Sequence, residues 1–208
     1  MRRLFIQFTT VLTLVFAPMV SLASPLVSPA WLSQKLDDNN VVVVDLRNKI
    51  DNGSYETFLE GHIPGAIHSD YLKEGWRVRR DGVVGLLPNA EQFQSLARRL
   101  GVSDETHVII VPAGVSSTDF GSSARAYWTF KVYGHNKVSI LDGGYAAWRE
   151  FAPSKIETGS FVAPNPGYLI AKFNPKFYIS TSDVAAFATN PGQALLVDGR
   201  TDEQFYAD

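Results

Sequence analysis

Three mostly apolar runs divide the chain, and the first two contain no polar residue. They are Val41–Val44, Val108–Val111 and Lys137–Leu141. A strand with one face in water alternates apolar and polar residues, whereas a strand of a parallel sheet is covered on both faces. The pattern therefore predicts buried parallel strands.

Helical patterns separate these strands. Asn89 is a good N-cap, and Gln92 follows three residues later as a capping box requires. The predicted helices run from Ser28-Pro29 to about Leu36, from Asn89 to Leu100, from Ser122 to Tyr133, and from Tyr145 to Glu150. Helices that alternate with strands indicate an α/β fold, with a mainly parallel central sheet flanked by helices on both faces.

The central strand leads into a polar, glycine-containing segment, Pro112–Gly121, which we predict to be a loop before the helix at Ser122. A strand, a loop and a helix N-terminus in this order can hold an anion, because free backbone N–H groups and the helix dipole converge there. The loop contains no thiol. Its chemically active side chains are Ser116, Ser117, Thr118 and Asp119.

Asp45 and Arg47 directly follow the first predicted strand. The carboxyl end of a parallel strand is where open α/β sheets bind ligands, so this pair is a candidate ligand site. A structural ion pair between neighbouring loops explains the same residues about equally well.

Two other polar features have structural explanations. His62 lies in the turn Gly61–Ala66 and can hydrogen-bond neighbouring loops without exchanging a proton. The basic segment Trp76–Arg80 fits a solvated surface better than the entrance of an anion site.

A second copy of the first pattern follows a change in composition. Residues 151–175 are rich in proline and read as a linker that wraps a surface. Helix, turn, apolar run and Asp-x-Arg then recur between Ser180 and Arg200, with Ala194–Val197 as the predicted strand. The second copy stops at Asp208. We therefore expect the chain to be the N-terminal part of a longer, two-domain protein.

Composition excludes several classes of function. The chain has 208 residues and a formal net charge of -2, which gives no reason to expect nucleic-acid binding. It has no cysteine, so disulfides and thiol chemistry are excluded for these residues. Its four histidines show no metal-ligand spacing, and we expect neither a metal nor a cofactor.

Residues 1–23 are predicted to be a signal peptide. Arg2 and Arg3 precede an apolar stretch, and Ser21-Leu22-Ala23 fits the small-x-small cleavage rule. Cleavage after Ala23 would make Ser24 the first mature residue. We expect an exported protein without a membrane segment after cleavage, most simply in a bacterial periplasm.

Three motifs in this order resemble the rhodanese-type sulfurtransferases, and more narrowly the tandem-domain thiosulfate and 3-mercaptopyruvate sulfurtransferases. The motifs are Val44–Arg47, Gly61–Ala66 and Leu141–Trp148. The resemblance implies a first rhodanese domain at residues 27–150, a linker at 151–175, and the start of a truncated second domain at 176–208.

The resemblance also implies a chemistry in which a cysteine after the central strand takes sulfane sulfur from a small donor. The resulting persulfide passes the sulfur to a thiol or to cyanide. Pro112 stands at that position here, and the segment from Pro112 to Arg125 looks longer than the family's active loop. In two-domain members the first domain is inactive and the second carries the cysteine, so this domain is expected to be catalytically silent.

Few site residues carry over from the family. The resemblance implies that Arg200 binds the anionic end of the substrate and that Asp198 orients the Arg200 side chain. Structural roles are expected for the remaining motif residues, namely Asp45, Arg47, His62, Arg125 and Asp142.

Two other functions compete with a sulfurtransferase. One is a non-catalytic rhodanese-like module that binds a partner or an anion. The other is a hydrolase that uses Ser116, Ser117 or Thr118, which is disfavoured because the chain lacks a Gly-x-Ser-x-Gly elbow.

Overall fold

The structure is a computed structural model, and it describes residues 23–160, 165–189, 192 and 194–207. The predicted signal peptide, apart from Ala23, lies outside the described residues, as does the Asn190-Pro191 part of a predicted turn. Among the described residues, no helix combines the length and the apolar character needed to cross a bilayer.

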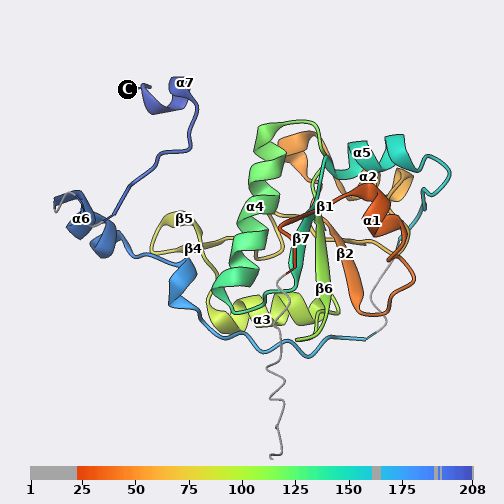
Figure 1. Cartoon of the computed structure of the whole chain (residues 1–208), viewed down its shortest axis with the longest axis horizontal. Helices are drawn as coiled ribbons and strands as arrows, with labels where there is room; N and C mark the ends of the chain where they lie inside the picture. Colours follow the sequence, from red (N-terminus) through yellow and green to blue (C-terminus); the bar gives the residue numbers. More distant parts are fainter. Residues whose placement is uncertain (1–22, 161–164, 190–191, 193, 208) are drawn as a thin grey trace, which may run out of the picture.

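The centre of the fold is a five-stranded sheet in the order β1-β7-β6-β2-β3, and every neighbouring pair is parallel (Figure 1). The strands are β1 (Leu26–Val27), β2 (Val41–Asp45), β3 (Ile67–His68), β6 (His107–Val111) and β7 (Val138–Leu141). The parallel sheet and its three central strands confirm the prediction from the apolar runs.

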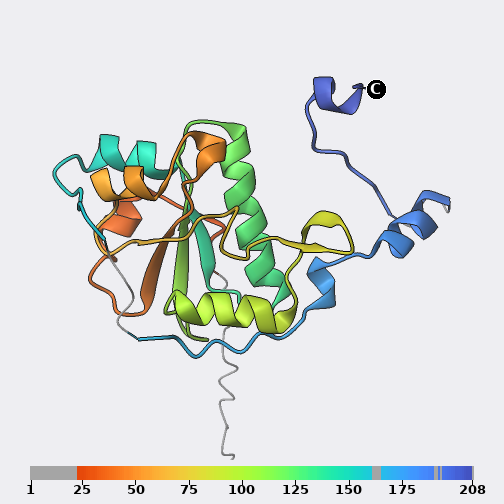
Figure 2. The same ribbon diagram turned by 180° about the vertical axis from the view of Figure 1, so that it is seen from behind.

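Helices cover both faces of this sheet, as predicted (Figures 1 and 2). One face carries α3 (Ala90–Arg99) and α4 (Ser117–Val132). The other face carries α1 (Pro29–Ser33), α2 (Tyr55–Glu60) and α5 (Gly144–Phe151). A short 3-10 helix, η1 (Lys49–Asp51), follows β2.

Alternate residues of each strand enter opposite cores. Val44 and Ile110 belong to the core beneath α3 and α4. Val43 and Ile109 belong to the core beneath α1, α2 and α5. Because both faces are buried, the strands carry apolar residues at consecutive positions rather than in alternation.

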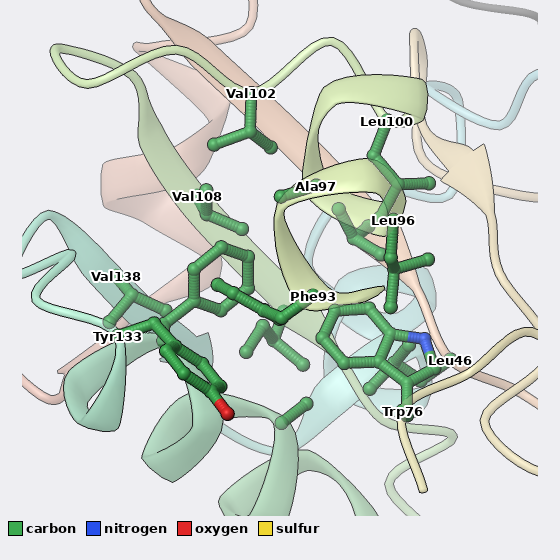
Figure 3. Packing of buried hydrophobic residues seen from close by; sticks show 14 of the residues in the cluster. Leu46, Trp76, Phe93, Leu96, Ala97, Leu100, Val102, Val108, Tyr133 and Val138 are labelled. Carbon is green, nitrogen blue, oxygen red and sulfur yellow. The ribbon is translucent and has the colours of Figure 1, made fainter. Parts of the chain in front are cut away.

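Trp76 corrects the prediction that Trp76–Arg80 is a solvated surface. Its side chain is completely buried in the core with Phe93 and Leu96 (Figure 3). The indole N–H donates to Ser69 Oγ at 2.9 Å, which satisfies the polar edge of the ring. Only the end of the basic segment is exposed.

That exposed end begins a hairpin that the sequence analysis missed. Strand β4 (Val78–Arg80) pairs antiparallel with β5 (Val83–Leu86). Asp81 and Gly82 connect them with φ of 51° and 82°. Asp-Gly is a frequent pair at such left-handed hairpin turns, so the sequence did contain the signal.

Helix α4 begins at Ser117, five residues before the predicted start. Ser116 is its N-cap, and Asp119 at the third helical position completes a capping box. The two reciprocal hydrogen bonds satisfy N–H groups that a polar loop would leave open. The loop after β6 is therefore only Pro112–Ser116, which corrects the prediction of a long loop to Gly121.

Residues 165–174 run along the edge of the body as an extended strap. The N–H groups of Gly167 and Leu169 donate to Arg98 and Val102 carbonyls at 2.8 and 3.1 Å. Leu169 is buried, so one side of the strap enters the core.

Beyond the strap, η2 (Pro175–Phe177) packs against α4, where Trp128 Nε1 donates to the Phe177 carbonyl. Helices α6 (Thr181–Thr189) and α7 (Asp202–Phe205) then extend away from the body (Figure 1). The prediction of a strand at Ala194–Val197 is wrong, because these residues form no strand. Leu195 and Val197 are 87% and 78% exposed. A strand needs a hydrogen-bonded neighbour, and the described residues supply none to this run.

Candidate functional site

The carboxyl ends of β2, β6 and β7 meet at one edge of the sheet, the expected place for a ligand site. The loop Pro112–Ser116 lies there against the start of α5. Tyr145 N–H donates to the Pro112 carbonyl at 2.8 Å, and Ala146 N–H to the Ala113 carbonyl at 3.0 Å. The loop is therefore fixed from one side by another element.

Two glycines permit this close docking. Gly114 has φ of +81°, and a Cβ atom there would lie 2.0 Å from the Gly143 carbonyl oxygen. Gly144 has φ of +59°, and its Cβ would lie 2.4 Å from the Pro112 oxygen. Both positions need a left-handed backbone and no side chain.

The turn of this loop forms the anion cradle that the sequence predicts, but the cradle is occupied. Gly114 N–H and Val115 N–H donate to Asp119 Oδ2 at 2.6 and 3.2 Å. Ser116 N–H and its hydroxyl donate to Asp119 Oδ1 at 2.9 and 3.1 Å. The chain's own carboxylate thus accepts all four hydrogen bonds.

Asp119 is 1% exposed, so its charge is buried beneath the loop. Burial alone would raise the pKa of this carboxyl group, but the backbone N–H groups of Val115, Ser116 and Gly114 outweigh burial and lower the pKa. The carboxylate is therefore ionised across the physiological range.

A second carboxyl group lies close by. Burial raises the pKa of Asp51, and the negative charges of Asp119 and Asp45 add to the increase, although hydrogen bonds from Asn48 and Gly53 oppose it. The charges of Asp119 and Asp45 thus act on Asp51 at this edge of the sheet.

Asp45 and Arg47 form a buried clamp. The Arg47 Nε lies 3.0 Å from both Asp45 oxygens, and Nη2 lies 2.8 Å from Oδ2. The same Nη2 donates to the Gly61 carbonyl at 2.8 Å, and the guanidinium lies 4.0 Å from the centre of the Tyr145 ring. The pair therefore links three elements, namely β2, α5 and the turn that follows α2. This is the geometry of a structural ion pair.

His62 is completely buried and connects the turn to the segment after α5. Its Nδ1 lies 2.8 Å from the Phe58 carbonyl, and its ring stacks on Phe58 at 3.9 Å. Its backbone exchanges two hydrogen bonds with Glu157. The remaining Nε2 lies 3.9 Å from Glu157 Oε2.

Arg125 and Asp142 lie apart from the cradle loop's hydrogen bonds. Arg125 Nη2 donates to the Gly85 carbonyl at 3.1 Å, and its guanidinium lies 4.6 Å from the Trp128 ring centre. It therefore anchors the β4–β5 hairpin to α4. The Asp142 side chain is exposed, while its backbone N–H donates to Val27 at the edge strand β1.

Asp198 and Arg200 repeat the first clamp almost atom for atom. Arg200 Nε lies 3.0 and 2.9 Å from the Asp198 oxygens, and Nη2 lies 2.7 Å from Oδ2. The side chains are 35% and 55% exposed, unlike the buried first pair. Hydrogen bonding from Arg200 lowers the pKa of Asp198.

The hydroxyl groups of the loop were the candidate nucleophiles of a hydrolase. The Ser116 hydroxyl is committed to the Asp119 cap, and in the part of the chain that the structure describes no hydroxyl of Ser116, Ser117 or Thr118 hydrogen-bonds a histidine. The described residues also contain no cluster of three or more potential metal ligands.

Comparisons with known proteins agree with the fold. Residues 28–151 match the rhodanese-like domain family. The chain is 31% identical to a 3-mercaptopyruvate sulfurtransferase of Escherichia coli (strain K12) over 182 residues, which cover 86% of this chain and 62% of the relative. It is 34% identical to a probable 3-mercaptopyruvate sulfurtransferase of Schizosaccharomyces pombe over 181 residues, covering 83% and 58%.

Among solved structures, SseA from Escherichia coli superposes with a TM-score of 0.75 at 29% identity, covering 89% of this chain and 69% of that one. The chain thus spans about 60% of the length of the curated relatives described above. The family match covers more than half of the chain and coincides with the parallel sheet and its helices. The chain therefore belongs to the rhodanese-like domain family.

Proposed function

We propose that this chain forms the non-catalytic first unit of a sulfurtransferase that transfers sulfane sulfur from thiosulfate or 3-mercaptopyruvate to a thiol or cyanide acceptor. The observation that carries the proposal is a rhodanese-like domain match over residues 28–151, with Pro112 after the central strand and no cysteine in the sequence. The relatives described above act on 3-mercaptopyruvate by name. The reaction then needs a cysteine outside these 208 residues.

The proposed reaction balances without a cofactor. A cysteine thiolate attacks the sulfane sulfur of thiosulfate, a new S–S bond forms, and the old S–S bond breaks with its electron pair leaving on sulfite. With 3-mercaptopyruvate the C–S bond breaks and pyruvate leaves after protonation. Cyanide or a thiolate then attacks the terminal sulfur and regenerates the thiolate.

We place the start of a second rhodanese unit at residues 176–208, after a linker at 151–175. The shared Asp-x-Arg clamp supports this assignment, because Asp198 and Arg200 adopt the geometry of Asp45 and Arg47. In both copies the arginine also lies near a phenylalanine ring, at 6.0 Å for Phe58 and 5.6 Å for Phe205.

Arg200 is the proposed contact for the substrate's anionic end, with Asp198 orienting its guanidinium. Arg200→Lys keeps the charge but loses the bidentate geometry, so it tests orientation, whereas Arg200→Ala tests charge. In the complete gene product, a substrate role predicts a raised KM for both variants with the fold intact. Loss of folding without any KM effect in the folded fraction would instead assign Arg200 a structural role like that of Arg47.

The proposal as a whole is tested by cyanolysis of thiosulfate and by pyruvate release from 3-mercaptopyruvate. This chain and the complete gene product are assayed together, and intact mass reports any added sulfur. Activity and a persulfide in the complete product alone would support the proposal. A complete product that is folded and inactive with both donors would favour a partner-binding module, the alternative function.

We also propose that the protein is exported and that Ser24 becomes its first residue, in a bacterial periplasm if the source is bacterial. Ser24 and Pro25 are part of the folded body, because the Ser24 carbonyl accepts from Ser139 Oγ and the Pro25 carbonyl from Ile140 N–H. Fractionation and the N-terminal mass of the mature protein test this. A full-length mass in the cytoplasm would refute it.

A further inference from the structure

Four donors of the loop before α4 converge on one side chain. The three consecutive N–H groups of Gly114, Val115 and Ser116, together with the Ser116 hydroxyl, lie 2.6–3.2 Å from the Asp119 oxygens. Convergent N–H groups at the start of a helix are an arrangement that stabilises an anion. Here the anion is covalently part of the helix that forms the cradle.

The carboxylate is held on the inner side of the loop. Gly114–Thr118 are exposed, whereas Asp119 is 1% exposed. The N–H groups therefore point inward, toward a carboxylate that bulk water barely reaches. A dissolved anion would have to displace the Asp119 carboxylate. Because that carboxylate is covalently attached to the same helix, its effective concentration at the cradle is always high.

The surroundings add negative charge. Asp51 lies close enough for the charge of Asp119 to raise its pKa, after the larger effect of its own burial. The guanidinium of Arg47, which also follows β2, is paired with Asp45 at 2.8 Å. An anionic sulfur donor at the loop would therefore meet the negative charge of Asp119, and Arg47 is already paired.

We propose that Asp119 closes the anion cradle of this unit, so that the first rhodanese unit is silenced by an internal carboxylate as well as by the lack of a cysteine. The inference rests on the proposed sulfur-transfer chemistry and names a residue that shapes specificity within the fold. On this proposal two residues together make the unit inactive: Pro112, which replaces the nucleophile, and Asp119, which occupies the cradle.

The proposal predicts how a thiol at the family's nucleophile position would behave. Pro112 precedes Gly114 by two residues, which span at most about 7 Å of chain. A thiol there would lie near a buried negative charge, which raises a thiol's pKa and suppresses the nucleophilic thiolate. The N–H groups of Gly114, Val115 and Ser116, which could otherwise stabilise the thiolate or a persulfide, would already be bonded to Asp119.

Three variants of the full chain test this. They are Pro112→Cys, Pro112→Cys with Asp119→Asn, and Pro112→Cys with Asp183→Asn. The third is a matched control, because Asp183 likewise caps a helix through Ser180 but lies fully outside the cradle. The Pro112 carbonyl that accepts from Tyr145 is kept in all three, and cysteine can adopt the backbone angles of proline.

The first measurement is the rate of alkylation by iodoacetamide against pH, and the second is sulfur addition from thiosulfate by intact mass. A like charge near a thiol shifts its pKa by about one unit or more, so thiolate at neutral pH should rise about tenfold when Asp119 is neutralised. We expect fast alkylation and an added sulfur only in the Asp119→Asn background. The sulfur enters as the thiolate attacks thiosulfate and sulfite leaves.

Equal reactivity of the three variants, or equal lack of reactivity in folded variants, would overturn the proposal. Tryptophan fluorescence and circular dichroism establish folding. If Asp119→Asn unfolds the chain, Asp119→Ser provides a second substitution that keeps a small hydrogen-bond acceptor. The result of this test does not depend on the activity of the complete gene product. If the proposed sulfurtransferase function were wrong, the complete gene product would be inactive whatever the Asp119 variants show.

Discussion

Removing the Asp45 carboxylate should cost far more than removing its exposed counterpart. In Asp45→Ala the Arg47 guanidinium keeps its bond to the Gly61 carbonyl but loses three contacts of 2.8–3.0 Å in a site where its side chain is 7% exposed. Breaking one side of a buried ion pair typically costs about 3–5 kcal/mol, because a charge is left buried without its partner.

The assay is urea unfolding followed by the fluorescence of Trp76 and Trp148, both completely buried. A loss of about 3–5 kcal/mol corresponds to a decrease in Tm on the order of 10 °C for a domain of this size. Asp198→Ala is the matched control, since the same clamp is exposed there and we expect no resolvable change in the same transition.

Equal effects of Asp45→Ala and Asp198→Ala would refute the reasoning, because burial would then not set the cost. A further variant, Asp45→Leu with Arg47→Met, separates charge from packing. Replacing a whole buried pair by apolar residues is often nearly neutral, so this double variant should be more stable than Asp45→Ala alone. If it is less stable, the clamp itself stabilises the fold beyond its own desolvation.

Three further predictions concern Asp119, Gly114 and the histidines His107 and His135. The pKa of Asp119 is lowered in the folded chain below the unfolded value of about 3.9, so its contribution to stability is present above about pH 4 and is lost as the pH falls through the folded value. The Tm difference between wild type and Asp119→Asn should therefore be largest near neutral pH and close under acid, and a constant difference would contradict this. Gly114→Ala should destabilise by more than about 2 kcal/mol in urea unfolding, whereas Gly65→Ala, also at positive φ but with no atom within 4 Å of the added Cβ, should cost only about 1 kcal/mol. Burial lowers the pKa values of His135 and His107, so stability should be complete above about pH 6.5 and fall as the pH decreases toward the folded values; His135→Gln should reduce this fall in urea midpoints, and an unchanged pH profile would exclude His135 as a cause.

The central strands were predictable because burial on both faces leaves a direct trace in the residue types of Val41–Val44 and Val108–Val111. The helix at Asn89 was predictable for a similar reason, since its capping box is local. The same kind of box at Ser116 and Asp119 was overlooked because the surrounding serines and Gly121 suggested a loop.

Other features depend on contacts that the local sequence does not contain. The segment Ala194–Val197 has the residue types of a strand, but strand formation requires a neighbour. Trp76 follows a polar segment, and only the packing of Phe93 and Leu96 shows why it is buried. At the site, the cradle could be predicted from the strand, loop and helix order, whereas its occupation by Asp119 depends on the fold of the loop.

The position of β1 has a consequence for the order of folding. Leu26 pairs with Ile140, so the edge strand that begins the body is completed only by residues near the end of the rhodanese unit. Closing a segment of this length costs more entropy than forming a local contact, and pairings of high contact order slow folding. Docking of β1 is thus expected to be a late step, and the outer edge of β7 stays unpaired until β1 docks.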